Sequence, residues 1–292
     1  MTLGSLSGRK DATSETTTTK DAPLGTLYGV SAGPGDPDLI SVKGVRLIQA
    51  STHIAFPAGS RGDTGSAPSR HRPGIAQRIV SPWLLPHHVL LPLQFPYTQD
   101  ATELTAAWTD AATVVVQVLT SQQDVVFVSE GDVAFYSTFA YLARYVTQLL
   151  PGVTVTAVPG VCSPLASAAA LGLPLALGDQ RLTVLPALYS VSGAVSDLET
   201  ALETSDVLVL MKVGSVYEQV WRVLQQRQLL EASYVVEWAT SDRQTIYHGL
   251  SDRPNLVLSY FSLMIIYVSP SQYGVPVPQE PQGASDQDDW SQ

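Results

Sequence analysis

The chain has 292 residues, of which 45% are hydrophobic and only 14% are charged, so it can form two domains with separate cores. Its 26 acidic residues outnumber its 16 basic ones, and the formal net charge of −10 opposes nonspecific binding to nucleic acid or to an anionic membrane surface. The single cysteine excludes an intrachain disulfide framework and argues against a thiolate metal cage.

The two ends of the chain show no pattern of a folded element. Residues 1–23 are polar, residues 271–292 form an acidic tail with Gln, Gly and Ser, and both segments are predicted to be disordered. No apolar run approaches the roughly 20 residues needed to cross a bilayer, and no apolar signal-peptide core begins the chain. Together with the lone cysteine, this predicts a cytoplasmic protein without a membrane partner.

Residues 24–159 are predicted to form an N-terminal α/β domain. Apolar stretches typical of strands begin at Thr26, Thr52, Asp124 and Val153. Two helical faces are also readable, one through Trp108, Ala111, Val115 and Val118 and the other through Phe139, Leu142, Val146 and Leu149. Between the second and third strands, residues 58–73 are rich in Gly, Pro, Ser and Arg, which predicts a mobile loop that could act as a lid.

Residues 160–270 are predicted to form a C-terminal α/β domain, with the boundary at about Pro159. Further strands are predicted to begin at Arg181, Asp206, Ser233 and Tyr260. Throughout the chain, apolar strand-like runs alternate with amphipathic stretches. That alternation predicts an α/β fold with largely parallel strands.

Three loops rich in glycine or proline each follow a predicted strand. They contain Gly33-Pro34-Gly35-Asp36, Gly131-Asp132 and Pro159-Gly160, the last followed by Ser163 as a predicted cap of a helix from Pro164. Each loop alone is as consistent with an ordinary turn as with a binding site, and Asp36 could face a cleft or cap a helix. Because ligands of open α/β sheets bind outside the carboxyl ends of strands, the three together predict a cleft.

An ordered set of motifs then points to a family. GPGDP, SEGDVAFYSTF, VPGVCS, LVLMKVGS and EWATSDRQTIY occur in this order over most of the chain, and together they resemble the tetrapyrrole methyltransferases of cobalamin biosynthesis. Within that family, EGDVAFYSTF, QFPYTQD, GDQRLTVLPALY and YFSLMIIY are most similar to the precorrin-2 methyltransferases that act at carbon 20. The resemblance implies two α/β domains with the active site in the cleft between them, S-adenosylmethionine as cofactor and S-adenosylhomocysteine as product.

The resemblance also implies which residues bind the cofactor. By position they are Pro34, Glu130, Gly131, Asp132, Phe135, Cys162, Ser163, Met211 and Ala239. Phe135 and Met211 suit the adenine or the sulfonium, although core filling is an alternative role for both. Backbone groups of the three loops are expected to bind the polar parts of the cofactor. The chain departs from the family at Ser31, Val133 and Cys162, where glycine, proline and a hydroxyl residue respectively are usual.

The implied reaction is C-methylation of precorrin-2 at carbon 20 to give precorrin-3A. Positioning should supply most of the rate, because the electron-rich ring carbon is itself the nucleophile and a base only removes the ring proton. Asp36, Glu130 and Asp132 are the nearby carboxylates by motif, and the sequence singles out none of them as the base. Alternatives are cobalt-precorrin-2, a different precorrin or uroporphyrinogen position, or a noncatalytic nucleotide-binding regulatory module.

Partners follow from charge and from the resemblance. Precorrin-2 is a polycarboxylate, so Arg61, Arg70, Arg72 and Arg78 are candidate substrate-binding residues, with solvated surface charge as the alternative. His87 and His88 are adjacent and the other histidines stand alone, so no metal site is predicted. The family implies a homodimer, and the acidic composition argues against a nucleic-acid partner.

Overall fold

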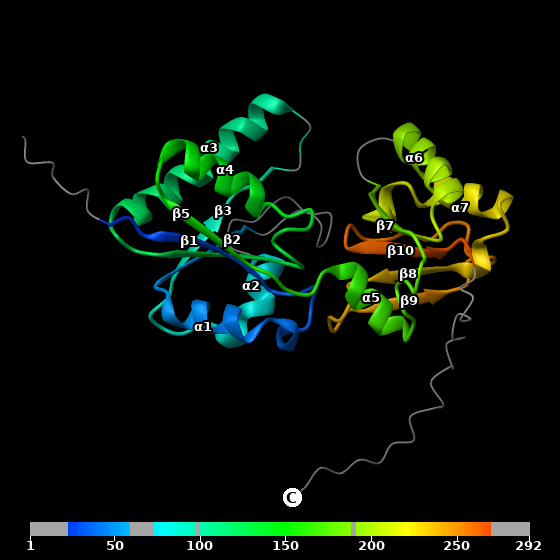
Figure 1. Ribbon diagram of the computed structural model, residues 1–292, viewed down its shortest axis with the longest axis horizontal. Helices are drawn as coiled ribbons and strands as arrows, with labels where there is room; N and C mark the ends of the chain where they lie inside the picture. Colours follow the sequence, from blue (N-terminus) through cyan, green and yellow to red (C-terminus); the bar gives the residue numbers. More distant parts are fainter. Residues whose placement is uncertain (1–22, 59–72, 97, 99, 188–190, 270–292) are drawn as a thin grey trace, which may run out of the picture.

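The computed structural model describes residues 23–58, 73–96, 98, 100–187 and 191–269, which form two α/β domains (Figure 1). The chain passes from the first domain to the second between a strand that ends at Val158 and a helix that begins at Ser163. This two-domain α/β architecture was predicted. The predicted disorder at both ends and nearly all of the predicted loop 58–73 lie outside the described residues.

The first sheet is parallel throughout and has the strand order β3-β2-β4-β1-β5. Its strands are β1 (Thr26–Ser31), β2 (His53–Pro57), β3 (Val89–Leu93), β4 (Val125–Ser129) and β5 (Thr154–Val158). Every residue of the central strand β4 is buried, which explains its continuous apolar sequence. Strand β3 was not predicted: it lies at the sheet edge, is mostly exposed and contains Pro92.

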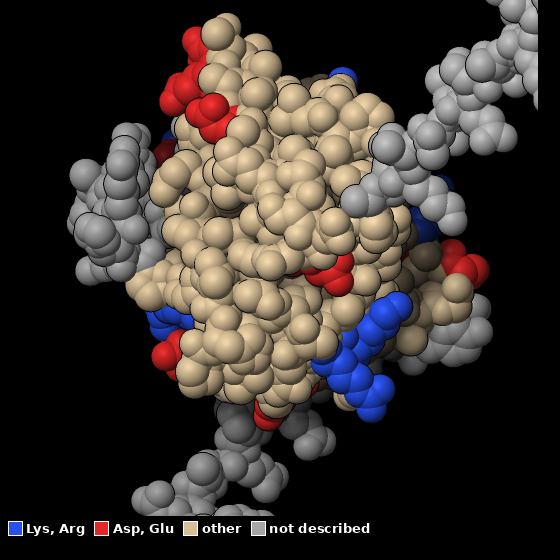
Figure 2. Space-filling model, turned by 90° about the vertical axis from the view of Figure 1, so that its left-hand side faces the viewer, with Lys and Arg blue, Asp and Glu red and all other residues tan. Residues whose placement is uncertain are grey.

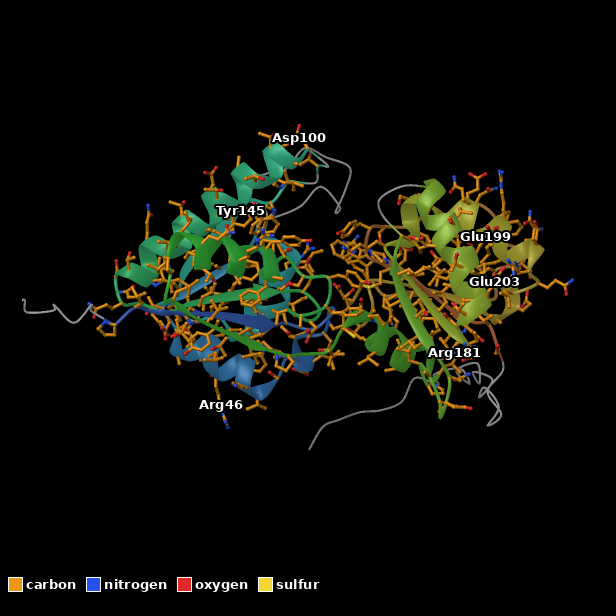
Figure 3. All side chains as sticks on the ribbon, turned by 45° about the horizontal axis from the view of Figure 1, so that its top comes forward. Arg46, Asp100, Tyr145, Arg181, Glu199 and Glu203 are labelled. Atoms are coloured by element: carbon orange, nitrogen blue, oxygen red, sulfur yellow. The ribbon has the colours of Figure 1, made fainter. Side chains whose placement is uncertain are left out.

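Two helical layers cover the first sheet. Helices α3 (Ala101–Thr120) and α4 (Phe139–Leu149) pack on one face, and α1 (Val42–Ala50) and α2 (Ile75–Val80) pack on the other (Figure 1). Helix α3 begins after Asp100, whose carboxylate accepts hydrogen bonds from the backbone amides of Thr102 and Glu103 (Figure 3). The predicted helical faces are therefore the core-facing ones, apart from their exposed end at Leu149.

The second sheet is mixed, so the prediction of largely parallel strands is wrong for this domain. Its order is β6-β7-β10-β8-β9, and only the β6–β7 pair is parallel. The strands are β6 (Leu182–Pro186), β7 (Val207–Met211), β8 (Ser233–Glu237), β9 (Thr245–His248) and β10 (Ser262–Tyr267). The connection from β8 to β9 is too short for a parallel crossover, so it must form a hairpin.

Helices also cover both faces of the second sheet. Helices α6 (Val191–Thr204) and α7 (Tyr217–Gln226) share a core cluster on one face, and α5 (Ser163–Leu171) packs on the other. Trp221 on α7 closes this core while its indole N–H donates to the Leu250 carbonyl at 2.7 Å. Among the helices that the structure describes, none combines the length and apolarity needed to cross a membrane.

The end of the first domain that points away from the second domain is largely uncharged. Figure 2 shows this face with separate small groups of basic and acidic side chains among uncharged ones. This face therefore lacks the continuous basic surface that is typical of nucleic-acid binding.

Candidate active site

A cavity of about 270 Å³ lies where strand ends of both sheets meet. Its lining includes Pro34 after β1, Gly131 after β4, Cys162 after β5 and Lys212 after β7. These residues lie beyond the carboxyl ends of their strands, which is where open α/β sheets bind ligands. The three loops that the sequence singled out therefore converge on one cavity, and the second domain adds the loop after β7.

Every residue predicted to contact the cofactor lies in the lining of this cavity. The set is Pro34, Glu130, Gly131, Asp132, Phe135, Cys162, Ser163, Met211 and Ala239. The lining also holds aromatic residues that the sequence did not assign to a site: Phe95, Trp108, Tyr136, Trp238, Tyr260 and Phe261. Trp108 had been assigned only to the core-facing side of a helix, and the other five lie within motifs that carried the resemblance but received no role there.

The first two loops are joined to each other through their glycines. The Gly33 amide donates to the Gly131 carbonyl at 3.2 Å, and the Gly131 amide donates to the Gly33 carbonyl at 2.8 Å. Both glycines have left-handed backbones, with φ of +80° and +68°. These two amides therefore bond within the protein, so any backbone contact of the loops with the polar parts of a ligand has to come from other groups.

Asp132 joins the second loop to the third. One of its carboxylate oxygens accepts from the Gly160 amide at 2.7 Å, and the other accepts from the Ala134 amide at 2.8 Å. The Ser31 hydroxyl lies 3.4 Å from the first of these oxygens. Asp132 thus fixes the relative positions of the three loops.

Ser31 and Val133 stand where glycine and proline are usual, and the structure shows that they are partners. The Ser31 side chain is fully buried, and its hydroxyl donates to the Val158 carbonyl at 2.8 Å and accepts from the Val133 amide at 2.9 Å. A proline at position 133 would have no N–H to satisfy. Valine introduces a buried donor, and the hydroxyl of Ser31 accepts from it.

We expect this coupling to be measurable in a double-mutant cycle. Ser31→Ala should lower the free energy of unfolding by about 1–3 kcal/mol, because the Val133 amide loses its buried acceptor. In a Val133→Pro background the same change should cost at least about 0.5 kcal/mol less. Urea unfolding of the four proteins measures both costs, and equal costs in the two backgrounds would contradict the pairing.

The structure settles the role of Asp36, which the sequence left open. Its carboxylate accepts from the Asp38 amide at 2.8 Å and caps a short helical turn, Pro37–Leu39, and Asp36 is absent from the cavity lining. Its own backbone amide donates to the Thr240 hydroxyl at 3.1 Å, which links the two domains. The predicted cap by Ser163 is wrong: Ser163 is the first residue of α5, and Cys162 occupies the capping position without a side-chain hydrogen bond.

Opposite charges from the two domains face the cavity. Among its described lining residues the charged ones are Glu130, Asp132 and Lys212. Burial raises the pKa of the Glu130 carboxyl, while its own backbone amide and the positive charge of Lys212 act in the opposite direction. Lys212 has a left-handed backbone with φ of 61°, and its ammonium group lies 5.0 Å from the centre of the Tyr260 ring.

The arginines predicted to bind substrate are not part of the described lining. Arg61, Arg70 and Arg72 lie outside the described residues, and Arg78 lies exposed on α2 and does not line the cavity. Across the part of the chain that the structure describes, no group of three His, Cys, Asp or Glu side chains could hold a metal ion.

The fold and the cavity define a two-domain α/β protein whose ligand site is built from strand ends of both sheets. The family model of the tetrapyrrole (corrin/porphyrin) methylases matches residues 26–253. The chain belongs to this family, which consists of S-adenosylmethionine-dependent methyltransferases.

Several curated proteins are similar to the chain. It is 31% identical over 246 residues to the cobalt-precorrin-2 C(20)-methyltransferase of Salmonella typhimurium, covering 83% of this chain and 96% of that protein. It is 31% identical over 257 residues to the precorrin-2 C(20)-methyltransferase of a Sinorhizobium species, covering 83% and 95%. It is also 33% identical over 250 residues to the cobalamin biosynthesis protein CobIJ of Mycobacterium tuberculosis, covering 83% of this chain but only 46% of that protein.

Solved structures show the same fold. The cobalt precorrin-4 methyltransferase CbiF superposes with a TM-score of 0.60 at 23% identity, covering 84% of this chain and 96% of that one. The uroporphyrin-III C-methyl transferase of Thermus thermophilus, complexed with S-adenosylhomocysteine, gives 0.58 at 21% identity, covering 83% and 97%. The predicted fold type is thereby confirmed.

Proposed function

We propose that this protein transfers a methyl group from S-adenosylmethionine to carbon 20 of precorrin-2, giving precorrin-3A and S-adenosylhomocysteine. The observation that carries the proposal is the common lining: all the cofactor-binding positions implied by the family resemblance surround one cavity between the domains. The similarity to relatives named as C(20)-methyltransferases supports the ring position.

The residues of the cavity fit this cofactor. Phe135, Met211 and Ala239 provide an apolar wall suited to the adenine, and Ser163 provides a hydroxyl for the polar groups. A side-chain carbon at Gly131 would meet nothing within 4 Å, so its backbone borders open space that a ligand can fill. Bound there, S-adenosylmethionine would supply the activated methyl group.

The contribution of this chain is to orient the substrate and to exclude water. Phe95 and Trp108 contact each other with ring centres 4.5 Å apart and planes tilted by 33°, and both line the cavity beside the loops that carry the predicted cofactor residues. Aromatic faces of this kind pack well against a flat macrocycle. Holding the ring carbon at the methyl group replaces a bimolecular encounter by an oriented one, which can supply much of the rate.

The decisive experiment is incubation of the purified protein with methyl-labelled S-adenosylmethionine and precorrin-2. We expect label in the tetrapyrrole, and NMR of the product should place the methyl group on carbon 20. Parallel incubations with cobalt-precorrin-2, later precorrins and uroporphyrinogen III test the alternative substrates. Binding of S-adenosylhomocysteine without methylation of any of these tetrapyrroles would instead support a noncatalytic regulatory module.

The arginine-rich segment is proposed to contact the substrate carboxylates. Replacing Arg61, Arg70 and Arg72 together by alanine should raise the KM for the tetrapyrrole and leave S-adenosylhomocysteine affinity unchanged, because guanidinium groups pair with carboxylates. Arg78→Ala should have the same effect, because Ile75 of the same helix lines the cavity. The control is Arg46→Ala, on the far side of α1 (Figure 3). An unchanged KM in steady-state assays would remove this role.

We also propose that the protein is a cytoplasmic homodimer, as the family resemblance implies. Light scattering at micromolar concentration should give twice the 31.2 kDa chain mass. A monomer mass would contradict the dimer without affecting the proposed reaction.

A further inference from the structure

The structure distinguishes among the carboxylates that the sequence left equivalent. Asp36 caps a helical turn outside the cavity, and both oxygens of Asp132 accept backbone hydrogen bonds that join the loops. Glu130 lines the cavity and accepts no side-chain hydrogen bond from another described residue. Of the three, it is the carboxylate that lines the cavity and whose hydrogen-bond donor is its own backbone amide and not another loop.

Glu130 sits at a junction of the two domains. It directly follows β4, at the centre of the first sheet, and Lys212 directly follows β7 in the second sheet. Both line the same cavity, and the positive charge of Lys212 acts on the Glu130 carboxyl. A ligand between the domains would therefore contact a carboxylate from one side and an ammonium group from the other.

We propose, building on the proposed function, that the Glu130 carboxylate accepts the proton that the ring carbon loses after methylation. The methylated ring carries one positive charge. Its C–H bond at the methylated carbon breaks, the electron pair of that bond returns to the ring, and the proton bonds to a carboxylate oxygen of Glu130. The ring becomes neutral and Glu130 becomes a neutral carboxylic acid, which then releases the proton to solvent.

The surroundings of Glu130 suit this role. Burial raises the pKa of its carboxyl and so makes the carboxylate a stronger base than an exposed glutamate, while the positive charge of Lys212 favours the ionised form that can accept a proton. The other titratable groups in the described lining are Asp132, Tyr136, Cys162 and Tyr260. Asp132 is the acidic neighbour, and its charge is already stabilised by the Gly160 and Ala134 amides.

The apoenzyme offers a readout that does not depend on turnover. Burial raises the pKa of Glu130 when the chain folds. Ionisation of this carboxyl therefore lowers the free energy of unfolding as the pH rises from the pKa in the unfolded chain to the pKa in the folded protein. Relative to the wild type, Glu130→Gln should therefore raise the free energy of unfolding of the apoenzyme more at pH 8 than at pH 4. The matched control is Glu199→Gln, an exposed residue on α6 of the second domain (Figure 3), whose effect should not change with pH.

Carbon-13 NMR of glutamate-labelled apoenzyme locates the titration itself. One side-chain carboxyl resonance should titrate with a higher pKa than the others. It should be absent from Glu130→Gln and present in Glu199→Gln. Lys212→Met should move this resonance to a still higher pKa, because the ammonium group that favours the carboxylate is gone. A Glu130 resonance that titrates with the exposed glutamates would overturn the proposal.

Single-turnover assays with precorrin-2 complete the test. Glu130→Gln should slow formation of the neutral product by at least about 100-fold, as expected for loss of a general base. Titration with S-adenosylhomocysteine in parallel measures any loss of a cofactor contact separately from the loss of the base, and Glu199→Gln should match the wild type in both assays. If the wild type turns over and Glu130→Gln keeps its rate and pH profile, the proposal fails while the proposed function stands. If the wild type methylates no tetrapyrrole, the proposed function fails and takes this role with it.

Discussion

Gly35→Ala should weaken S-adenosylhomocysteine binding by at least about tenfold and lower the Tm by about 2–4 °C. A side-chain carbon at position 35 would lie 2.7 Å from both the Ala239 carbonyl oxygen and the Ser241 amide nitrogen. Both are backbone atoms of the second domain, so no side-chain rotation relieves the clash. The two domains must separate, and Pro34 and Ala239, which line the cavity from opposite domains, move apart.

The turn opposite Gly35 is poorly able to yield. Trp238 and Thr240 both have left-handed backbones, with φ of 50° and 63°, and the guanidinium of Arg243 lies 3.9 Å from the centre of the Trp238 ring. The control is Gly152→Ala, where the added carbon meets nothing within 4 Å but the backbone has φ of +88°, so this change should lower the Tm by backbone strain and leave S-adenosylhomocysteine affinity unchanged. Calorimetric titration and thermal unfolding provide the measurements. Unchanged S-adenosylhomocysteine affinity in Gly35→Ala would show that the domain contact does not shape the cavity.

Asp132→Ala should lower the free energy of unfolding by about 2–4 kcal/mol, because hydrogen bonds to charged groups contribute about 1.5–3 kcal/mol each. The Gly160 and Ala134 amides would both lose a charged acceptor, and the three loops would lose their common contact. Asp132→Asn should lose less, since its one amide oxygen can still accept from Gly160. We therefore expect cofactor affinity to fall in the order wild type, Asp132→Asn, Asp132→Ala.

Urea unfolding and S-adenosylhomocysteine titration of these variants measure both effects. The control is Asp110→Ala, an exposed position in the middle of α3, which should change stability by no more than about 0.5 kcal/mol. If Asp132→Ala were as stable as Asp110→Ala, the carboxylate would not hold the loops together. If affinity fell without loss of stability, Asp132 would bind the cofactor directly.

Strands were predictable where burial on both sides dictates the residues. Strands β4, β7 and β10 are buried along their whole length, and their sequences are continuous apolar runs. Edge strands are partly exposed and do not need such a run, so they are harder to predict: β3 and β9 were missed, whereas the edge strands β5 and β6 were found. Strand direction in the second sheet was predicted wrongly, because apolar runs look alike in parallel and antiparallel pairs.

The site was predictable as far as it depends on local chain geometry. A glycine-rich turn after a strand lies at the carboxyl end of that strand in any α/β sheet, so Pro34, Gly131 and Cys162 could be placed at one edge. The aromatic lining residues could not, because a tryptophan or phenylalanine that packs in a core has the same sequence signature as one that faces a ligand. Nor could the pairing of Ser31 with Val133, since the two residues lie far apart in the chain.

The sequence by itself determined the two-domain α/β class and, through the resemblance of its ordered motifs, the family and nine of the residues that line the cavity. These features depend on apolar periodicity, on turn chemistry and on the order of motifs, all of which are local in the chain. Only the tertiary structure decided that Asp36 caps a helical turn, that Asp132 joins two loops and that Glu130 lines the cavity under the influence of Lys212. A carboxylate acts according to the donors and charges around it, and those come from the Asp38 amide, from Lys212 and from Gly160, brought near by folding.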